Sequence, residues 1–197
     1  MRFELMYESF FKILEGVPLT LEVVLISTFL GFGLAIIVAL MRISDNKFYS
    51  VPAYSFIYVI RGTPLLLQLY FVYYGISQFS FVRESFLWPI LREPFWCGII
   101  TLTISTGAYS AEILRGGIQS VSQGYIESGK ALGLGRVSLF FRIVMPITIR
   151  QALPAYGNEL ILMVKASSLI SIVTLMEITG IARTIISKTY APVEIFL

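Results

Sequence analysis

Long apolar runs alternate with short polar links along this chain of 197 residues. A helix needs roughly 20 mostly apolar residues to cross a bilayer. A fifth, shorter apolar run begins at about Ala191 and the sequence stops at Leu197, so we expect the chain to end, or to have been cut, inside a fifth helix. The pattern predicts an all-α membrane protein with one transmembrane domain over residues 1–197. The full-length predicted spans are about 19–41, 52–77, 95–114 and 156–176.

The polar links differ in positive charge. In the link 78–94 both arginines are followed directly by a glutamate, whereas the links 42–51 and 115–155 carry uncompensated cations. Cytoplasmic links carry an excess of Lys and Arg, so we predict that these two links face the cytoplasm and that the N-terminus lies outside. The cations that decide this are Arg42, Lys47, Arg115, Lys130, Arg136, Arg142 and Arg150.

Composition agrees with a bilayer environment and narrows the possible chemistry. Hydrophobic residues make up 56% of the chain and charged residues 14%, and the mean hydropathy of +0.80 is too high for a soluble domain. The chain has no His, which removes the commonest general base and metal ligand. The single cysteine, Cys97, rules out an intrachain disulfide and a multi-cysteine metal site. We therefore expect no catalytic residue and no metal site.

The first predicted span carries small residues at a four-residue spacing. Gly31, Ala35 and Ala39 follow this rhythm, which lets helix backbones approach closely in a membrane. We interpret the stripe as tight packing inside one subunit. An interface between subunits is the alternative.

A polar stretch from Glu127 to Pro146 interrupts the apolar pattern. The segment 125–132 is long enough for two helical turns, and Gly133 and Gly135 are expected to end it. A second short helix is expected over 136–144, with Pro146 as its limit or as a kink. The apolar residues of the first helix would be buried in a groove of a partner protein. The alternative is a helix lying flat on the membrane, held by lipid phosphates.

The beginning of this stretch resembles a phosphate-binding loop only in spacing. Gly124, Gly129 and Lys130 fit the pattern, but Ala131 stands where a Ser or Thr would hold magnesium. No buried strand is predicted before it. We therefore exclude nucleotide binding by this chain.

The same stretch resembles the cytoplasmic loop of permease subunits of ATP-binding-cassette (ABC) importers. That loop reads E-A-A, three residues, G, nine residues, I-x-L-P, and here Ser and Gly replace the two alanines and Met145 the leucine. The segments 61–68, 108–117 and 153–159 resemble signatures of the polar amino-acid branch, and the chain is similar to histidine/lysine/arginine/ornithine and opine permeases. The matching residues of the loop are Glu127, Ser128, Gly129, Gly133, Ile143 and Pro146.

The resemblance implies an architecture and a set of partners. It implies a type I ABC importer transmembrane domain with about five helices in the bacterial inner membrane, and a coupling helix between the third and fourth helices that docks on an ATPase subunit. The loop 125–139, within the segment 121–146, would make that contact. The implied partners are a second, unlike permease subunit, two ATPase subunits and an external solute-binding protein. ATP and Mg²⁺ would act in the ATPase, with no cofactor and no nucleic acid in this chain, and the substrate would be a polar amino acid, basic ones included, or an opine.

Two charged residues fall inside the fourth predicted span. Intramembrane charges are costly, so Glu159 and Lys165 are expected to face a partner or a wet cavity. By the resemblance, Glu159 occupies a substrate-contacting position of relatives that move cationic amino acids, although Ala166 stands where those relatives have an acid. The alternative is that Glu159 pairs with Arg150 or Lys165.

Small hydroxyl residues recur at helical spacing in the third and fourth predicted spans. Spacings of three and four residues place each group on one helix face. Such faces would offer hydrogen bonds to a passing zwitterion. The alternative is that each hydroxyl bonds to a carbonyl of its own helix. The groups are Thr103, Thr106, Gly107 and Ser110, and Ser167, Ser171 and Thr174.

Two further features are assigned structural roles. Pro64 is expected to kink the second predicted span, and Arg61 either caps the carbonyl groups freed there or faces the cavity, with the first role preferred. Glu112 and Arg115 stand three residues apart, which predicts an ion pair on one helix.

Two other functional classes compete with a permease subunit. An intramembrane enzyme would need a catalytic set, and the chain offers no His and no acids paired at a useful spacing. A stand-alone transporter driven by an ion gradient would need two inverted repeats with a broken helix in each. Only one span is interrupted by proline.

Overall fold

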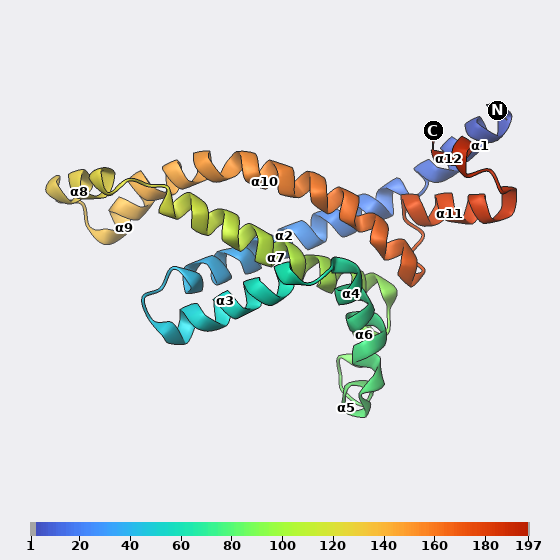
Figure 1. Ribbon diagram of the computed structural model, residues 1–197, viewed down its shortest axis with the longest axis horizontal. Coiled ribbons are helices and arrows are strands. Elements are labelled where there is room, and N and C mark those ends of the chain that lie inside the picture. Colours follow the sequence, from blue (N-terminus) through green and yellow to red (C-terminus); the bar gives the residue numbers. More distant parts are fainter. Residues whose placement is uncertain (1–2, 197) are drawn as a thin grey trace. The chain divides into compact units, whose positions relative to one another are not determined.

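The computed structural model describes residues 3–196, and Figure 1 shows its helices in sequence colours. No strand occurs among these residues, which confirms the all-α prediction. The chain divides into two compact units. Unit 1 comprises Met1–Thr28, Pro64–Leu102 and Met163–Leu197, and unit 2 comprises Phe29–Thr63 and Thr103–Leu162.

Three long helices contribute residues to both units. They are α2 (Val17–Arg42), α7 (Pro94–Gln119) and α10 (Met145–Ser167). The remaining elements of unit 1 are α1 (Phe3–Leu14), α4 (Leu65–Tyr70), the π-helical turn η1 (Phe71–Gly75), the 3₁₀ turn η2 (Ile76–Gln78), α5 (Ser80–Arg83), α6 (Trp88–Leu91), the 3₁₀ helix η4 (Ser168–Val173), α11 (Ile178–Thr189) and α12 (Pro192–Phe196). Those of unit 2 are α3 (Lys47–Gly62), α8 (Gln123–Ala131), α9 (Arg136–Leu139) and the π-helical turn η3 (Phe140–Val144).

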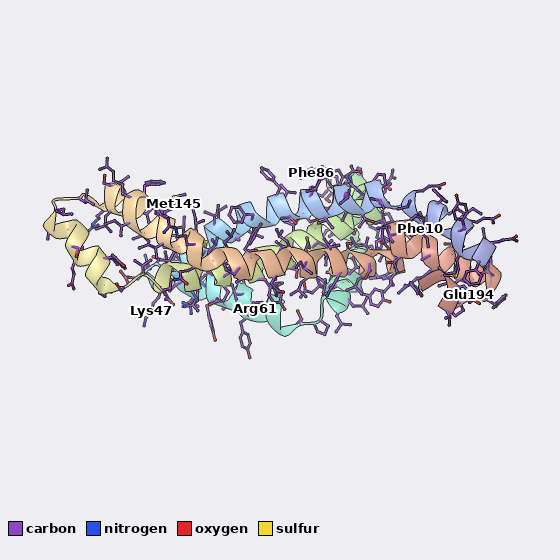
Figure 2. All side chains as sticks on the ribbon, turned by 90° about the horizontal axis from the view of Figure 1, so that it is seen from above. Phe10, Lys47, Arg61, Phe86, Met145 and Glu194 are labelled. Atoms are coloured by element: carbon purple, nitrogen blue, oxygen red, sulfur yellow. The ribbon has the colours of Figure 1, made fainter. Side chains whose placement is uncertain are left out.

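Unit 1 is built around an apolar core between α2, α4, α7 and the end of α10. Its largest side chains have almost no exposed surface, because each helix presents branched aliphatic residues to the others. Helices α1, α11 and α12 pack against one another (Figure 1), and Figure 2 labels Phe10 on α1 and Glu194 on α12. The core residues are Val23, Val24, Leu69, Ile99, Leu102, Met163, Ile170 and Val173.

Helix α11 begins at a buried carboxylate in unit 1. The side chain of Glu177 accepts hydrogen bonds from the backbone N–H groups of Thr179 and Gly180, each at 2.9 Å, and so caps the helix. Burial raises the pKa of Glu177, and these two hydrogen bonds act in the opposite direction. The N–H of Ile178 donates to the hydroxyl oxygen of Thr20 at 3.3 Å, which ties the start of α11 to α2.

Unit 2 is built around contacts between small residues. The core side chains are mostly alanines, drawn from α2, α3 and α7: Ala35, Val38, Ala39, Ala53, Ile57 and Ala111. A Cβ atom on Gly31 would lie 2.8 Å from the Cβ of Thr106 and 3.1 Å from the carbonyl oxygen of Thr103. Helices α2 and α7 therefore approach so closely that only glycine fits at this position. The prediction that the stripe of Gly31, Ala35 and Ala39 packs inside one subunit is confirmed.

Three described helices are long and apolar enough to cross a membrane: Phe3–Arg42, Pro94–Gln119 and Arg136–Val173. The bent pair Lys47–Gly62 and Leu65–Gln78 is a fourth candidate if it counts as one span. The fifth apolar run contributes the short helix α12, and Leu197 lies outside the described residues.

The second predicted span is broken more sharply than a kink. Its two helices meet at 104°, because Pro64 has no N–H and disfavours helical geometry at the residue before it. Thr63 is accordingly extended, with φ −112° and ψ 141°. The hydroxyl of Thr63 donates to the carbonyl oxygen of Val59 at 2.8 Å and satisfies one of the freed groups.

The helix that contains the predicted span 156–176 begins well before residue 156. The chain is helical from Arg136 to Val173, whereas the sequence offered Pro146 as the limit of a separate short helix or as a kink. Pro146 lies in the first turn of α10, directly after the π-helical turn η3. Of the two outcomes that the sequence offered, a limit or a kink, the first does not occur, because the wider turn before Pro146 accommodates the missing N–H without interrupting the helix.

The close contact of α2 and α7 can be tested at two glycines of one helix. A leucine side chain at Gly31 would overlap Thr106, whereas a Cβ at Gly33 meets no atom within 4 Å. We expect Gly31→Leu to lower the free energy of unfolding by about 1–3 kcal/mol and Gly33→Leu to leave it unchanged or raise it. Thermal unfolding of the purified protein in detergent measures both. Equal melting temperatures for the two variants would contradict the contact.

Candidate functional site

The polar stretch forms a short helix with a fixed end in unit 2. Helix α8 is followed by Gly133, whose φ of +79° lies in the left-handed region. The N–H of Gly133 donates to the carbonyl oxygen of Lys130 at 2.9 Å, and the N–H of Leu134 to that of Gly129 at 3.1 Å. These two bonds make a Schellman motif, which glycine favours because it has no Cβ to strain. Gly133 therefore ends α8 as the sequence predicts.

Helix α8 is held against η3 by a glycine that faces the interior. A Cβ on Gly129 would lie 2.7 Å from Cδ1 of Ile143 and 3.1 Å from Cδ1 of Leu139. Gly129 is buried, and this contact brings two residues of the loop motif, Gly129 and Ile143, together. The sequence identified both positions but did not predict that they touch.

Three large apolar side chains of the segment 123–137 are exposed. Leu132 is 82% exposed, Val137 71% and Tyr125 59%. Exposing side chains of this size to water is unfavourable by about 1.5–3 kcal/mol each relative to burial. These side chains are candidates for contact with another molecule.

The remaining residues of the loop motif lie around this surface. Glu127 and Ser128 are exposed on α8, and the Ser128 hydroxyl donates to the carbonyl oxygen of Gly124 at 2.7 Å. Residues 124–130, which have the spacing of a phosphate-binding loop, lie inside α8. The helix engages their backbone N–H groups from its second turn on.

A second feature of unit 2 is a cavity of about 430 Å³ between α2, α3 and α7. Its lining carries three arginines, three tyrosines and one glutamate. The guanidinium of Arg42 lies 5.0 Å from the ring centre of Tyr54, and that of Arg61 lies 5.0 Å from that of Tyr109. The lining residues are Arg42, Tyr54, Ile57, Tyr58, Arg61, Gly62, Tyr109, Glu112 and Arg115.

Some charged residues of this cavity form an ion pair, whereas others lie over aromatic rings. Glu112 and Arg115 form the predicted ion pair, which is confirmed, and Arg115 also donates to Gln119. Arg61 lines the cavity and lies over the ring of Tyr109. At the bend it is the hydroxyl of Thr63 that donates to a freed carbonyl group. The sequence signal for this cavity is the spacing of Tyr54, Tyr58 and Arg61 on one face of α3, which the sequence analysis did not use.

Glu159 lies half-buried in α10, within unit 2. Among residues 3–196, no ion pair joins it to Arg150 or Lys165, the partners that the sequence offered. Its role in contacting substrate stays a prediction.

The two groups of hydroxyl residues differ in their surroundings. Thr103 and Thr106 lie in α7 against Gly31, at the closest contact of α2 and α7. Ser167 donates to the carbonyl oxygen of Val164 at 2.8 Å, and Ser171 to that of Ser168 at 2.7 Å.

The common face predicted for the second hydroxyl group is wrong. The helix tightens to the 3₁₀ form at Ser168, and Thr174 takes the left-handed conformation with φ 69°. The spacing of an α-helix therefore no longer applies between Ser167, Ser171 and Thr174. The assignment of Thr103, Thr106, Ser167 and Ser171 to a substrate path stays a prediction.

The part of the chain that the structure describes contains no group of three or more His, Cys, Asp or Glu side chains able to hold a metal ion. Two other features of unit 2 are the exposed apolar side chains of the segment 123–137 and the arginine-lined cavity.

Comparison with known proteins places these features in a family. The family described as "Binding-protein-dependent transport system inner membrane component" matches residues 31–191. The chain is 52% identical over 191 residues to the octopine transport system permease protein OccM of Rhizobium radiobacter, covering 97% of this chain and 78% of the relative. It is 52% identical over 198 residues to the nopaline transport system permease protein NocM of Agrobacterium fabrum, covering 100% and 82%.

More distant relatives extend the match. The chain is 38% identical over 182 residues to the histidine/lysine/arginine/ornithine transport system permease protein HisM of Escherichia coli, covering 92% of this chain and 76% of the relative. A crystal structure of an amino acid ABC transporter with histidines matches with a TM-score of 0.87 and 33% identity, over 100% of this chain and 87% of that one. These matches confirm the predicted permease fold. The chain belongs to the family of inner membrane components of binding-protein-dependent transport systems.

Proposed function

We propose that this permease subunit imports a polar amino acid or an opine across the inner membrane, driven by ATP that a separate subunit hydrolyses. The similarity to octopine, nopaline and histidine/lysine/arginine/ornithine permeases over nearly the whole chain supports this substrate class. The single observation that carries the coupling to ATP is the exposed apolar surface of the segment 123–137, presented on a helix with a fixed end.

The proposed coupling contact has a physical basis in the segment 125–139. Leu132 and Val137 project apolar side chains that the subunit itself does not cover. Beneath them, Gly129 packs against Ile143 of η3, which continues directly into α10. A push on α8 by the ATPase would therefore be passed to a long helix of the membrane domain. Glu127, Ser128 and Pro146 flank this contact.

The proposed assembly follows from the family and from the charge of the links. A binding-protein-dependent system has an ATPase and a periplasmic binding protein as partners of the permease. We propose two ATPase subunits beneath, a second and unlike permease subunit beside this chain, and the N-terminus outside. The excess of Lys and Arg in the links 42–51 and 115–155 supports this orientation. ATP and Mg²⁺ act in the ATPase, and this chain performs no chemistry of its own.

We further propose that Glu159 lies on the substrate path. It is half-buried in α10, and a carboxylate there suits the ammonium or guanidinium group that polar amino acids and opines carry. Thr103, Thr106, Ser167 and Ser171 are the hydroxyl residues proposed along the same path.

The docking surface can be tested with one charge. Leu132→Asp places a carboxylate where the proposed contact buries an apolar side chain, and losing about 2 kcal/mol weakens binding about 30-fold. We expect the ATPase to be lost from the purified complex while the permease still inserts. Phe86→Asp is the matched control, because Phe86 is 88% exposed but lies in the link predicted to be external. Retention of the ATPase by Leu132→Asp, with uptake still driven by ATP, would refute the contact.

The fixed end of α8 can be tested separately from docking. Gly133→Ala forces a Cβ into the left-handed region, at a cost of about 1–2 kcal/mol, and we expect amide hydrogen exchange in residues 129–134 to accelerate about fivefold or more. Gly135→Ala is the control, since Gly135 has an ordinary φ of −67° and open space around its Cβ position. Equal exchange in the two variants would show that the left-handed turn does not hold the helix.

The transport reaction can be tested in proteoliposomes that contain the whole complex. We expect uptake of arginine, octopine or nopaline to require ATP, the ATPase and the binding protein together. A proton or sodium gradient imposed without the ATPase should drive no uptake. Gradient-driven uptake by the permease alone would identify an ion-coupled transporter and contradict the proposal.

A further inference from the structure

We propose that the arginine-lined cavity of unit 2 binds the phosphate headgroup of an anionic phospholipid from the cytoplasmic leaflet. The site lies between the end of α2, one face of α3 and the last turns of α7. It uses the membrane orientation proposed above, and it does not depend on which solute is transported.

The cavity has more positive charge than its own residues neutralise. Three arginines line it against the single acid Glu112, which is paired with Arg115. Arg42 has no carboxylate within ion-pair distance among residues 3–196. An anion is therefore the ligand that the charge of the cavity favours.

The guanidinium of Arg42 is positioned to bind an anion. Its guanidinium lies over the ring of Tyr54, and its Nε atom is buried without a hydrogen-bond partner among the described residues. A buried donor without an acceptor is unfavourable. A phosphate oxygen is an acceptor that guanidinium binds well, in a planar and often bidentate manner.

The depth of the cavity favours a lipid over a free phosphate ion. Arg42 is the last residue of α2, and Arg115 lies about 6 Å from the end of α7 at the α-helical rise per residue. With the links 42–51 and 115–155 in the cytoplasm, both arginines lie at the level of lipid headgroups. Tyr109 lies about 15 Å from the end of α7 by the same rise, so the cavity continues toward the apolar part of the membrane.

Exposed aromatic rings border the cavity on the side of α3. Tyr54 and Tyr58 stack at 6.0 Å along α3 and remain exposed, and Lys47 and Arg61 mark the two ends of this helix in Figure 2. Tyrosine is enriched at membrane interfaces, where the ring is apolar and the hydroxyl is wet. Basic pockets between transmembrane helices on the cytoplasmic side are sites of anionic headgroup recognition.

The test measures lipid bound to the purified transporter complex by native mass spectrometry, with phosphatidylglycerol and phosphatidylethanolamine as probes. We expect phosphatidylglycerol to be retained in preference. Arg42→Gln should weaken its binding by more than the roughly fivefold that one cation near a membrane surface contributes. Lys47→Gln, which removes the same charge from the same link outside the cavity, should stay within that factor.

Arg42→Lys keeps the positive charge of the cytoplasmic link and so preserves the orientation signal. It lacks the planar fork that stacks on Tyr54 and bridges two phosphate oxygens, so we expect weaker retention of phosphatidylglycerol than in the original protein. The site would be overturned if all variants retained phosphatidylglycerol equally, or if Arg42→Gln and Lys47→Gln lost it equally. Either result would mean that the lipid is held by general attraction to the positive charge of the link.

Two competition arms separate the lipid from other anions. Displacement of phosphatidylglycerol by glycerol 3-phosphate would identify a site for a soluble phosphate, and displacement by octopine would place the cavity on the path of the solute. Either result overturns the proposal. ATP-driven uptake measured on the same preparations keeps the two proposals apart, since a transporter that imports solute without retaining lipid refutes the lipid site alone.

Discussion

Close approach between helix backbones is the constraint on which unit 2 depends. In a membrane the lipid tails are as apolar as the side chains, so helices associate through packing rather than through exclusion of water. Gly31 and Gly107 allow α2 and α7 to touch, because a Cβ on Gly107 would lie 2.6 Å from Leu34. Gly117 lies against Thr148 and Ala152 of α10 in the same way. A succession of small residues thus connects α2 to α7 and α7 to α10.

The same device continues into the polar segment. Gly129 fits beneath Ile143 and Leu139, so α8 is joined to η3 by packing as well as by the chain. The turn η3 has the π-helical form. This form is rare in proteins overall, and many of its occurrences are at functional sites. Helix α8 therefore combines a fixed internal contact with exposed apolar side chains in the segment 123–137. A flexible loop with the same sequence motif would absorb a displacement instead of passing it on.

The sequence predicts the elements better than it predicts their ends and contacts. The apolar runs and the motif from Glu127 to Pro146 identify the helices and the family, because length and spacing are local properties. The 104° bend at Pro64 and the continuous helix across Pro146 are two opposite results of the same residue type. Thr63 takes extended geometry before Pro64, whereas a π-helical turn accommodates Pro146. Which outcome occurs depends on the conformation of the preceding turn, and the presence of a proline does not determine that conformation.

The arginine-lined cavity shows why charge counting gives only part of the information in a membrane protein. Arg42 enters the orientation argument as one cation among several, and for that purpose a lysine would serve equally well. In the structure its guanidinium lies over Tyr54 with Nε buried, a position that depends on the flat shape of the group. The partner ring stands on α3, beyond the link that the charge count considers. The orientation signal is therefore a property of the link, whereas the binding chemistry arises only when α2, α3 and α7 come together around it.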